Sequence, residues 1–115
     1  MNLQLNAADT VPIIFGGDFN SISHLDDGLG KSGHSKLMMW AGFSDTFRQI
    51  HDDKTKDPGY SIGGSSARID YIYYLGKGLE LHEAGPIAPN FKGKESRTPG
   101  YPSDHLGIVA KFEVR

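Results

Sequence analysis

The chain has 115 residues, 12 basic and 14 acidic side chains, a formal net charge of -2 and 37% hydrophobic residues. This length fits one domain at most, and the composition indicates a soluble globular protein rather than a disordered one. The near-neutral balance carries no electrostatic signature of a nucleic-acid binder and leaves only a local basic patch open. Because there is no cysteine, disulfides, thiolate metal sites and a cysteine nucleophile are excluded.

The amino terminus carries no targeting signal that the sequence reveals. The first nine residues have no basic start and no long apolar run, so we expect no signal peptide. No stretch approaches transmembrane length, and we expect a soluble protein whose compartment is unknown.

The first part of the chain predicts a strand and then a helix. Residues 11–15 are apolar, partly β-branched and followed by two glycines, which favours a buried strand. Residues 21–33 are typical of a loop. Apolar residues spaced i, i+3 and i+4 predict a helix over 34–41, with Trp40 in the core.

The rest of the chain predicts three more strands. Residues 44–50 indicate a second short helical turn capped by Ser44. Strands are predicted over 67–75, 79–84 and 106–114 from their β-branched, aromatic or alternating residues. Four strands and one or two helices predict an α/β fold of the α+β type, and the sequence leaves the strand pairing open.

Three short segments place acidic, amide or imidazole groups beside strand-like stretches. They are GGDFNS at 16–21, RIDYIY at 68–73 and PSDH at 102–105. Hydrolysis of a phosphate ester needs a cation that neutralises developing charge, a group that activates or orients water, and donors to the nonbridging oxygens. Together the three segments offer these groups.

Each segment has a plainer interpretation when it is taken alone. Asp18 is a common turn residue, Ser103-Asp104 could cap a helix, and Arg68 and Asp70 could form a structural ion pair. All three segments in this order are harder to explain in that way. Asp70 is the natural partner to fix the tautomer of His105, since its strand could neighbour residues 106–114.

The ordered set resembles the endonuclease/exonuclease/phosphatase family, which has the deoxyribonuclease I-like fold. The region Trp40–Phe47 is also similar to a Gly-Phe-x-Asp-x-(Phe/Trp)-Arg stretch of that family. The resemblance implies half of a four-layer α/β-sandwich. Residues 1–115 would be the carboxyl-terminal half of the domain, with the amino-terminal half and its metal-binding Asn and Glu absent.

The resemblance also implies roles for five residues. Asp18 would orient or deprotonate the attacking water, and Asn20 would hold a phosphate oxygen. Asp104, together with Asp18, would bind Mg²⁺ or Mn²⁺. Asp70 would hydrogen-bond His105, which would contact the scissile phosphate as a base or as a charge stabiliser. Whether the aspartate or the histidine takes the proton stays open.

Other polar residues carry less weight. Lys94 and Arg97 lie in a loop whose charge could attract a phosphate-bearing substrate, and Tyr60 resembles a substrate-side loop position of the family. The segments 24–27 and 51–53 are interpreted as an exposed loop and a solvated turn.

The expected function is metal-dependent hydrolysis of a phosphodiester or phosphomonoester, incomplete in this chain alone. The substrate could be DNA, RNA, a phosphoinositide, sphingomyelin or a small phosphoester. The alternative is a noncatalytic fragment that acts by self-association, as a homodimer, or by pairing with a separate amino-half chain. Apolar sheet surface left uncovered would favour such association.

Overall fold

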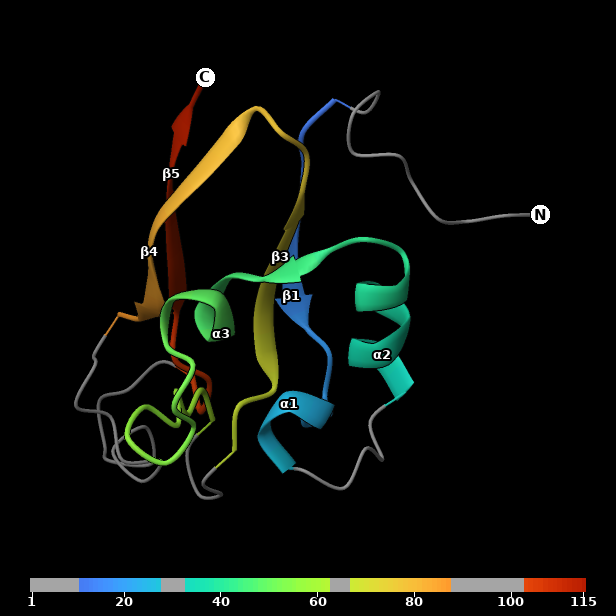
Figure 1. Cartoon of the computed structure of the whole chain (residues 1–115). Helices are drawn as coiled ribbons and strands as arrows, with labels where there is room; N and C mark the ends of the chain where they lie inside the picture. The colour runs from blue at the N-terminus through green and yellow to red at the C-terminus, as the bar shows by residue number, and fades with distance from the viewer. Residues whose placement is uncertain (1–10, 28–32, 63–66, 88–102) are drawn as a thin grey trace.

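The computed structural model describes residues 11–27, 33–62, 67–87 and 103–115. This part of the chain forms three short helices and five strands in two antiparallel sheets, which confirms the predicted α/β class (Figure 1). The elements in chain order are β1 (Ile13–Asp18), α1 (His24–Asp27), α2 (Gly33–Trp40), β2 (Ser44–Asp45), α3 (Thr46–Ile50), β3 (Asp70–Leu75), β4 (Leu79–Pro86) and β5 (Ile108–Val114).

The strand β3 is the centre of the larger sheet, whose order is β1-β3-β2. Its residues alternate between buried and half-buried, as expected of a strand covered on both faces. Tyr71 and Tyr73 point to one face and are 1% and 0% exposed. The antiparallel register pairs Asp18 with Asp70, so the end of β1 lies beside the start of β3.

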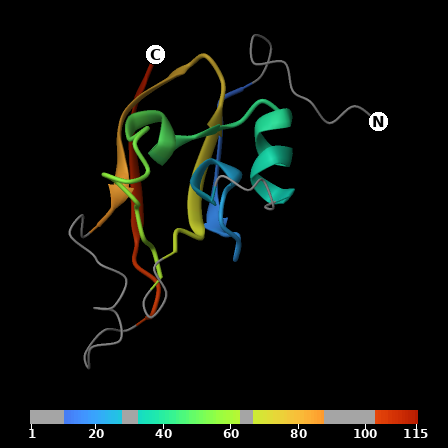
Figure 2. The same cartoon turned by 60° about the horizontal axis from the view of Figure 1, so that its bottom comes forward.

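Different elements cover the two faces of β3. On the face of Tyr71 and Tyr73, the ring of Phe19 packs edge-on against both tyrosines and stacks on His34 of α2. On the opposite face, Tyr74 meets Phe112 of β5 edge-on with ring centroids 5.1 Å apart. Two views agree that α2 lies on one side of the β1–β3 pair and the β4–β5 sheet on the other (Figures 1 and 2).

Buried charges join α1, β2, α3 and the segment just before β3. Arg68 donates to both carboxylate oxygens of Asp26 and to both of Asp45, at 2.7 to 3.1 Å. Arg48 donates to Asp26 at 2.7 Å. The side chain of Asp26 is only 12% exposed, so the interpretation of residues 24–27 as an exposed polar loop is wrong. We call these four residues the charge cluster.

Three further local predictions are wrong. The region predicted as a loop contains α1, whose His24 N–H donates to Ser35 of α2. Asp45 rather than Ser44 caps α3, since its carboxylate accepts the N–H groups of the first turn. Trp40 is 53% exposed, because α2 docks through its polar side, on which Ser35 is fully buried.

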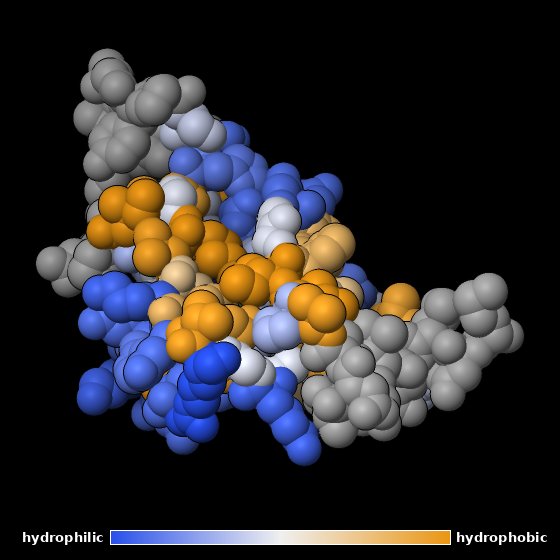
Figure 3. Space-filling model, turned by 90° about the horizontal axis from the view of Figure 1, so that it is seen from above, coloured by the Kyte–Doolittle hydropathy of each residue, from blue (hydrophilic) through white to orange (hydrophobic). Residues whose placement is uncertain are grey.

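The surface keeps large apolar residues in contact with solvent. Figure 3 shows apolar residues gathered in a band that is bordered by hydrophilic ones. Exposed large apolar side chains are found at Val11, Ile14, Phe15, Ile22, Leu37, Met39, Trp40, Ile50, Ile87, Val109 and Val114. Among the described helices, none has the length and apolar character needed to cross a membrane.

Candidate active site

The candidate site lies where three segments far apart in the sequence meet. Asp18 ends β1 and Asp70 begins β3, directly opposite each other in the ladder. His105 comes just before β5, and its backbone pairs with Ile62. Because alternate residues of a strand share a face, Asp18 and Asp70 point to the face of β3 that β5 covers. All three predicted segments therefore deliver a side chain to one place.

Hydrogen bonds to Asp70 orient the imidazole of His105. The Nδ1 atom lies 2.9 Å and 3.1 Å from the two carboxylate oxygens of Asp70, which confirms the predicted contact. With Nδ1–H donating, Nε2 faces the other side of the ring, 3.8 Å from Asp18 Oδ2 and 4.0 Å from Asp104 Oδ1. The hydrogen bond to Asp70 raises the pKa of His105 above its ordinary value, and the charges of Asp18 and Asp104 act in the same direction.

The site has a protected side and a solvent side. The Asp70 side chain is 12% exposed, whereas those of Asp18 and Asp104 are 50% and 60% exposed. Asp70 therefore lies behind the imidazole, and the other two carboxylates lie where water and substrate have access. An open groove of about 340 Å³ runs past Asp18 and Asp70.

The turn after β1 holds Asn20 beside Asp18. The Asn20 N–H donates to Asp18 Oδ1 at 2.7 Å. Asn20 adopts φ 50°, in the left-handed region that asparagine tolerates better than most residues. This turn leaves the Asn20 side chain exposed at the same edge of the sheet as Asp18.

Ser61 holds two segments of the site together by hydrogen bonds, a role that the sequence analysis did not predict. Its buried Oγ accepts the N–H groups of Ile69 at 3.0 Å and Asp70 at 3.2 Å. Its carbonyl oxygen accepts the N–H of Leu106 at 2.8 Å. One residue thus ties the segment of Asp70 to the segment of His105. No motif or spacing signals this role, because the contact crosses a loop.

The donor set fits a hard divalent cation. Ligand atoms of Asp18, Asp70 and His105 lie within 4.8 Å of one another. Mg²⁺ prefers a few carboxylate oxygens together with water and substrate phosphate. Asp18 is the exposed carboxylate of this group, whereas Asp70 is already bound to His105. Asp104 is outside the group, although its exposed carboxylate lies 4.0 Å from His105 Nε2.

The other predicted site residues do not join this group. Tyr60 lines a separate pocket between α3 and β4 rather than the groove beside Asp18. Lys94 and Arg97 lie outside the described residues. Residues 51–53 are more than a solvated turn, because His51 contacts the ring of Phe47 and the carbonyl oxygen of Ala84.

Known proteins resemble the chain at the level of sequence. The family model described as Endonuclease/Exonuclease/phosphatase family matches residues 1–105. An uncharacterized protein of Caenorhabditis elegans is 29% identical over 147 aligned residues, which cover 97% of this chain and 44% of that protein. Nocturnin of Xenopus laevis is 28% identical over 111 residues, which cover 90% of this chain and 27% of nocturnin. No solved structure matches. The chain spans less than half the length of these relatives.

Proposed function

Because the chain belongs to the endonuclease/exonuclease/phosphatase family, we propose that it hydrolyses phosphate esters with an activated water molecule. The observation that supports this most is the imidazole of His105, held by Asp70 on one nitrogen and turned toward Asp18 with the other. Phosphoryl transfer depends mainly on positioning and electrostatic stabilisation, and this arrangement offers both.

In this proposal His105 works through Nε2. When the ring is protonated, Nε2–H donates to a phosphate oxygen and stabilises the charge that develops on it. When the ring is neutral, Nε2 accepts the proton of the attacking water. Asp18, 3.8 Å away, is the other candidate for that proton. In either case water attacks phosphorus in line, the bond to the leaving oxygen breaks, and that oxygen takes up a proton.

Asp104 and Asp18 would hold a divalent cation, with Mg²⁺ or Mn²⁺ as the proposed ion. Enzymes of this family generally depend on such an ion, which supplies positive charge against the phosphate oxygens. The exposed carboxylates of the two residues support this assignment. Asn20 would donate its side-chain amide to a nonbridging oxygen, since its turn places it beside Asp18.

We also propose that residues 1–115 correspond to the carboxyl-terminal half of the family's domain. The relatives are more than twice as long as their matched part, and apolar residues such as Ile14 and Phe15 of β1 are half exposed. A second copy or a separate amino-half chain would cover them. Light scattering at increasing concentration should then show a dimer, and a monomer throughout would contradict self-association.

The function is tested by hydrolysis of bis(p-nitrophenyl) phosphate with and without Mg²⁺. We expect weak Mg²⁺-dependent turnover that His105→Ala abolishes, while His82→Ala, an exposed histidine on β4, leaves it unchanged. Turnover that survives His105→Ala would overturn the proposal. No turnover in any variant would favour the second candidate, a noncatalytic fragment, for which the partial coverage of the relatives is the supporting observation.

A further inference from the structure

The turn after β1 carries Asp18 and Asn20, two of the residues that the proposed function uses. Asn20 adopts φ 50°, and its N–H donates to Asp18 Oδ1 at 2.7 Å. A left-handed conformation at a residue other than glycine persists where the surrounding contacts fix it. The contacts made by its two neighbours, Phe19 and Ser21, therefore determine how firmly Asp18 and Asn20 are held.

The side chain of His34, on α2, contacts both neighbours of Asn20. Its imidazole stacks on the ring of Phe19, with centroids 4.7 Å apart and planes inclined by 25°. Its Nδ1 atom forms a hydrogen bond of 2.5 Å with Ser21 Oγ. One residue of α2 thus contacts the chain immediately before and immediately after the left-handed residue.

The imidazole of His34 is itself fixed by the sheet. Its Nε2 atom lies 3.1 Å from the hydroxyl oxygen of Tyr73, whose side chain is buried, and the ring of Tyr71 lies 4.9 Å away between centroids. A neutral imidazole donates with one nitrogen and accepts with the other, and a hydroxyl can do either, so both hydrogen bonds form at once. Burial and the charge of Arg68 lower the pKa of His34, which favours this neutral form.

The contacts from the sheet and the contacts from α2 act on different parts of the turn. The N–H of Phe19 donates to the carbonyl oxygen of Ile69 at 2.9 Å, and the Tyr71 hydroxyl lies 2.8 Å from the carbonyl oxygen of Ser21. These two hydrogen bonds hold backbone atoms on either side of Asn20. His34 holds the side chains of the same two residues, so it adds a restraint that the backbone bonds do not supply.

We propose that His34 is a positioning residue of the candidate active site, which holds the turn of Asp18 and Asn20 through its contacts with Phe19 and Ser21. Asp18 points to the face of the β1–β3 pair that β5 covers, whereas α2 lies on the other side of this pair (Figures 1 and 2). His34 therefore acts from behind the site and not on the substrate. The inference rests on the proposed function for the use of the turn, but the geometry of the turn is measured without hydrolysis.

The test is an NMR measurement on the metal-free chain. Amide hydrogen exchange of Phe19 reports how often the turn opens, and the three-bond coupling between the amide and α protons of Asn20 reports its φ. In His34→Ala we expect exchange at Phe19 to become about tenfold faster, the effect of losing one hydrogen bond, and the coupling of Asn20 to change. Amides of the β4–β5 sheet should keep their exchange rates, which separates local loosening from a general loss of stability.

His24→Ala is the matched control. The His24 imidazole also contacts α2, since its Nδ1 atom lies 2.6 Å from Ser35 Oγ, but this bond joins α1 to α2 rather than the turn to α2. The backbone N–H of His24 still donates to Ser35 in this variant, so α2 keeps a bond to α1. We expect no change at Phe19 or Asn20. Equal effects of His24→Ala and His34→Ala would overturn the proposal, because His34 would then act only by docking α2.

Two conservative variants isolate the hydrogen bond to Ser21. The side-chain amide of asparagine can take the place of Nδ1 and that of glutamine the place of Nε2. His34→Asn can therefore keep the bond to Ser21, and His34→Gln the bond to Tyr73. We expect slower exchange at Phe19 in His34→Asn than in His34→Gln, and the difference should vanish when Ser21→Ala is added. Equal exchange in His34→Asn and His34→Gln would overturn the proposal.

Ser21→Ala alone keeps the test decisive if His34→Ala does not fold. It removes only the hydroxyl of the turn, and unchanged exchange at Phe19 would overturn the proposal. Turnover of bis(p-nitrophenyl) phosphate is measured separately, and kcat should fall in each variant that loosens the turn. Faster exchange with an unchanged kcat would overturn the positioning role. If the unmodified chain has no turnover, the proposed function fails, whereas the NMR measurements still decide whether His34 holds the turn.

Discussion

Arg68 is the residue whose replacement should cost the fold most. Its side chain is 3% exposed and makes four hydrogen bonds to Asp26 and Asp45, whose side chains are 12% and 2% exposed. Burial alone would lower the pKa of Arg68, but the hydrogen bonds to Asp45 and Asp26 outweigh burial and hold the pKa above its ordinary value. The guanidinium therefore stays charged, and both carboxylates depend on it.

Arg68→Met keeps most of the side-chain volume and removes the charge. Breaking a buried ion pair costs about 3–5 kcal/mol, because the partner charge stays buried without compensation. Asp26 keeps its bond to Arg48, and Asp45 keeps the N–H groups at the start of α3. Since each carboxylate retains some donors, we expect the lower end of that range, about 3 kcal/mol.

Urea unfolding followed by far-UV circular dichroism measures this loss. Arg115→Met is the control, because Arg115 pairs with Glu80 at the exposed surface, where an ion pair contributes little to stability. Adding Asp45→Asn to Arg68→Met should cost less than the sum of the two single losses, since both belong to one network. A loss for Arg68→Met no larger than that for Arg115→Met would refute the reasoning.

Three smaller predictions concern the candidate site. Ser61→Ala leaves the buried N–H of Ile69 and the partly buried N–H of Asp70 without their acceptor and should cost about 1–3 kcal/mol in the same urea assay; an unchanged midpoint would contradict the proposed support. Asp70→Asn should lower the pKa of His105 in an NMR titration, because the hydrogen bond to Asp70 is the main cause of the raised value; an unshifted titration would contradict this cause. Since the folded-state pKa of His105 is raised, the stability it contributes is fully present below the unfolded pKa and is lost as pH rises through the folded pKa. The difference in the free energy of unfolding between the unmodified chain and Asp70→Asn should therefore shrink as pH rises through the folded-state pKa of His105. Asp104→Ala should reduce the broadening of the His105 signals by Mn²⁺, and equal broadening would exclude Asp104 as a ligand.

The sequence predicted the strands well because their apolar patterns are local. The region before the two glycines, the region after Arg68 and the last segment each form a strand, with bounds shifted by a few residues. In β5, Ile108 and Phe112 fall on the covered side as the alternation predicts. Successive side chains of a strand point to opposite faces, so this alternation can be recognised from residues that are adjacent in the sequence.

The helices were harder to predict because distant contacts determine them. The start of α1 is fixed by Ser35 and by the partners of Asp26, none of which is close in sequence. The exposure of Trp40 follows from a docking face made of polar and aromatic groups, including His34, which an apolar count does not detect. Local pattern and tertiary packing disagree at these positions.

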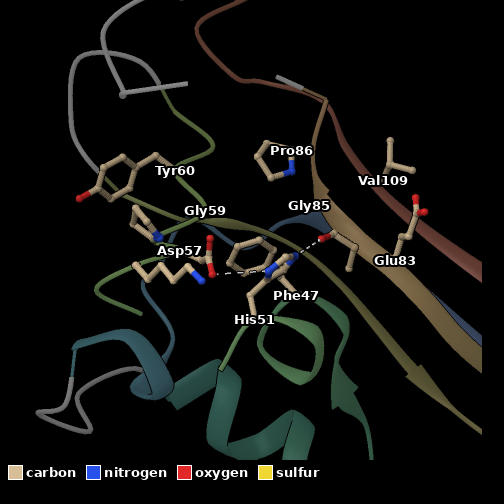
Figure 4. A pocket seen from close by; sticks show the side chains of 12 residues that line it. Phe47, His51, Asp57, Gly59, Tyr60, Glu83, Gly85, Pro86 and Val109 are labelled. Atoms are coloured by element: carbon tan, nitrogen blue, oxygen red, sulfur yellow. Dashed lines mark hydrogen bonds and ion pairs between the residues drawn. The ribbon is translucent and has the colours of Figure 1, made fainter. Parts of the chain in front are cut away.

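Part of the candidate site could be inferred from residue types alone. The hydrogen bond between Asp70 and His105 was predicted from the need of an imidazole for a carboxylate, and it is present. Tyr60 was expected at a substrate-side loop position by resemblance to the family, and in the structure it lines the separate pocket between α3 and β4 (Figure 4). Loop geometry of this kind has no periodic signal in the sequence.

The charge cluster also bears on how quickly the chain folds. Asp26 and Arg68 are 42 residues apart, and Asp45 and Arg68 are 23 apart. Closing such long loops costs chain entropy before any contact repays it, so the guanidinium should meet its carboxylates late in folding. Until then three charged groups must stay hydrated, which opposes early burial of the tyrosines of β3. If these contacts form after the transition state, substitutions of Asp26, Asp45 or Arg68 should raise the unfolding rate far more than they lower the refolding rate.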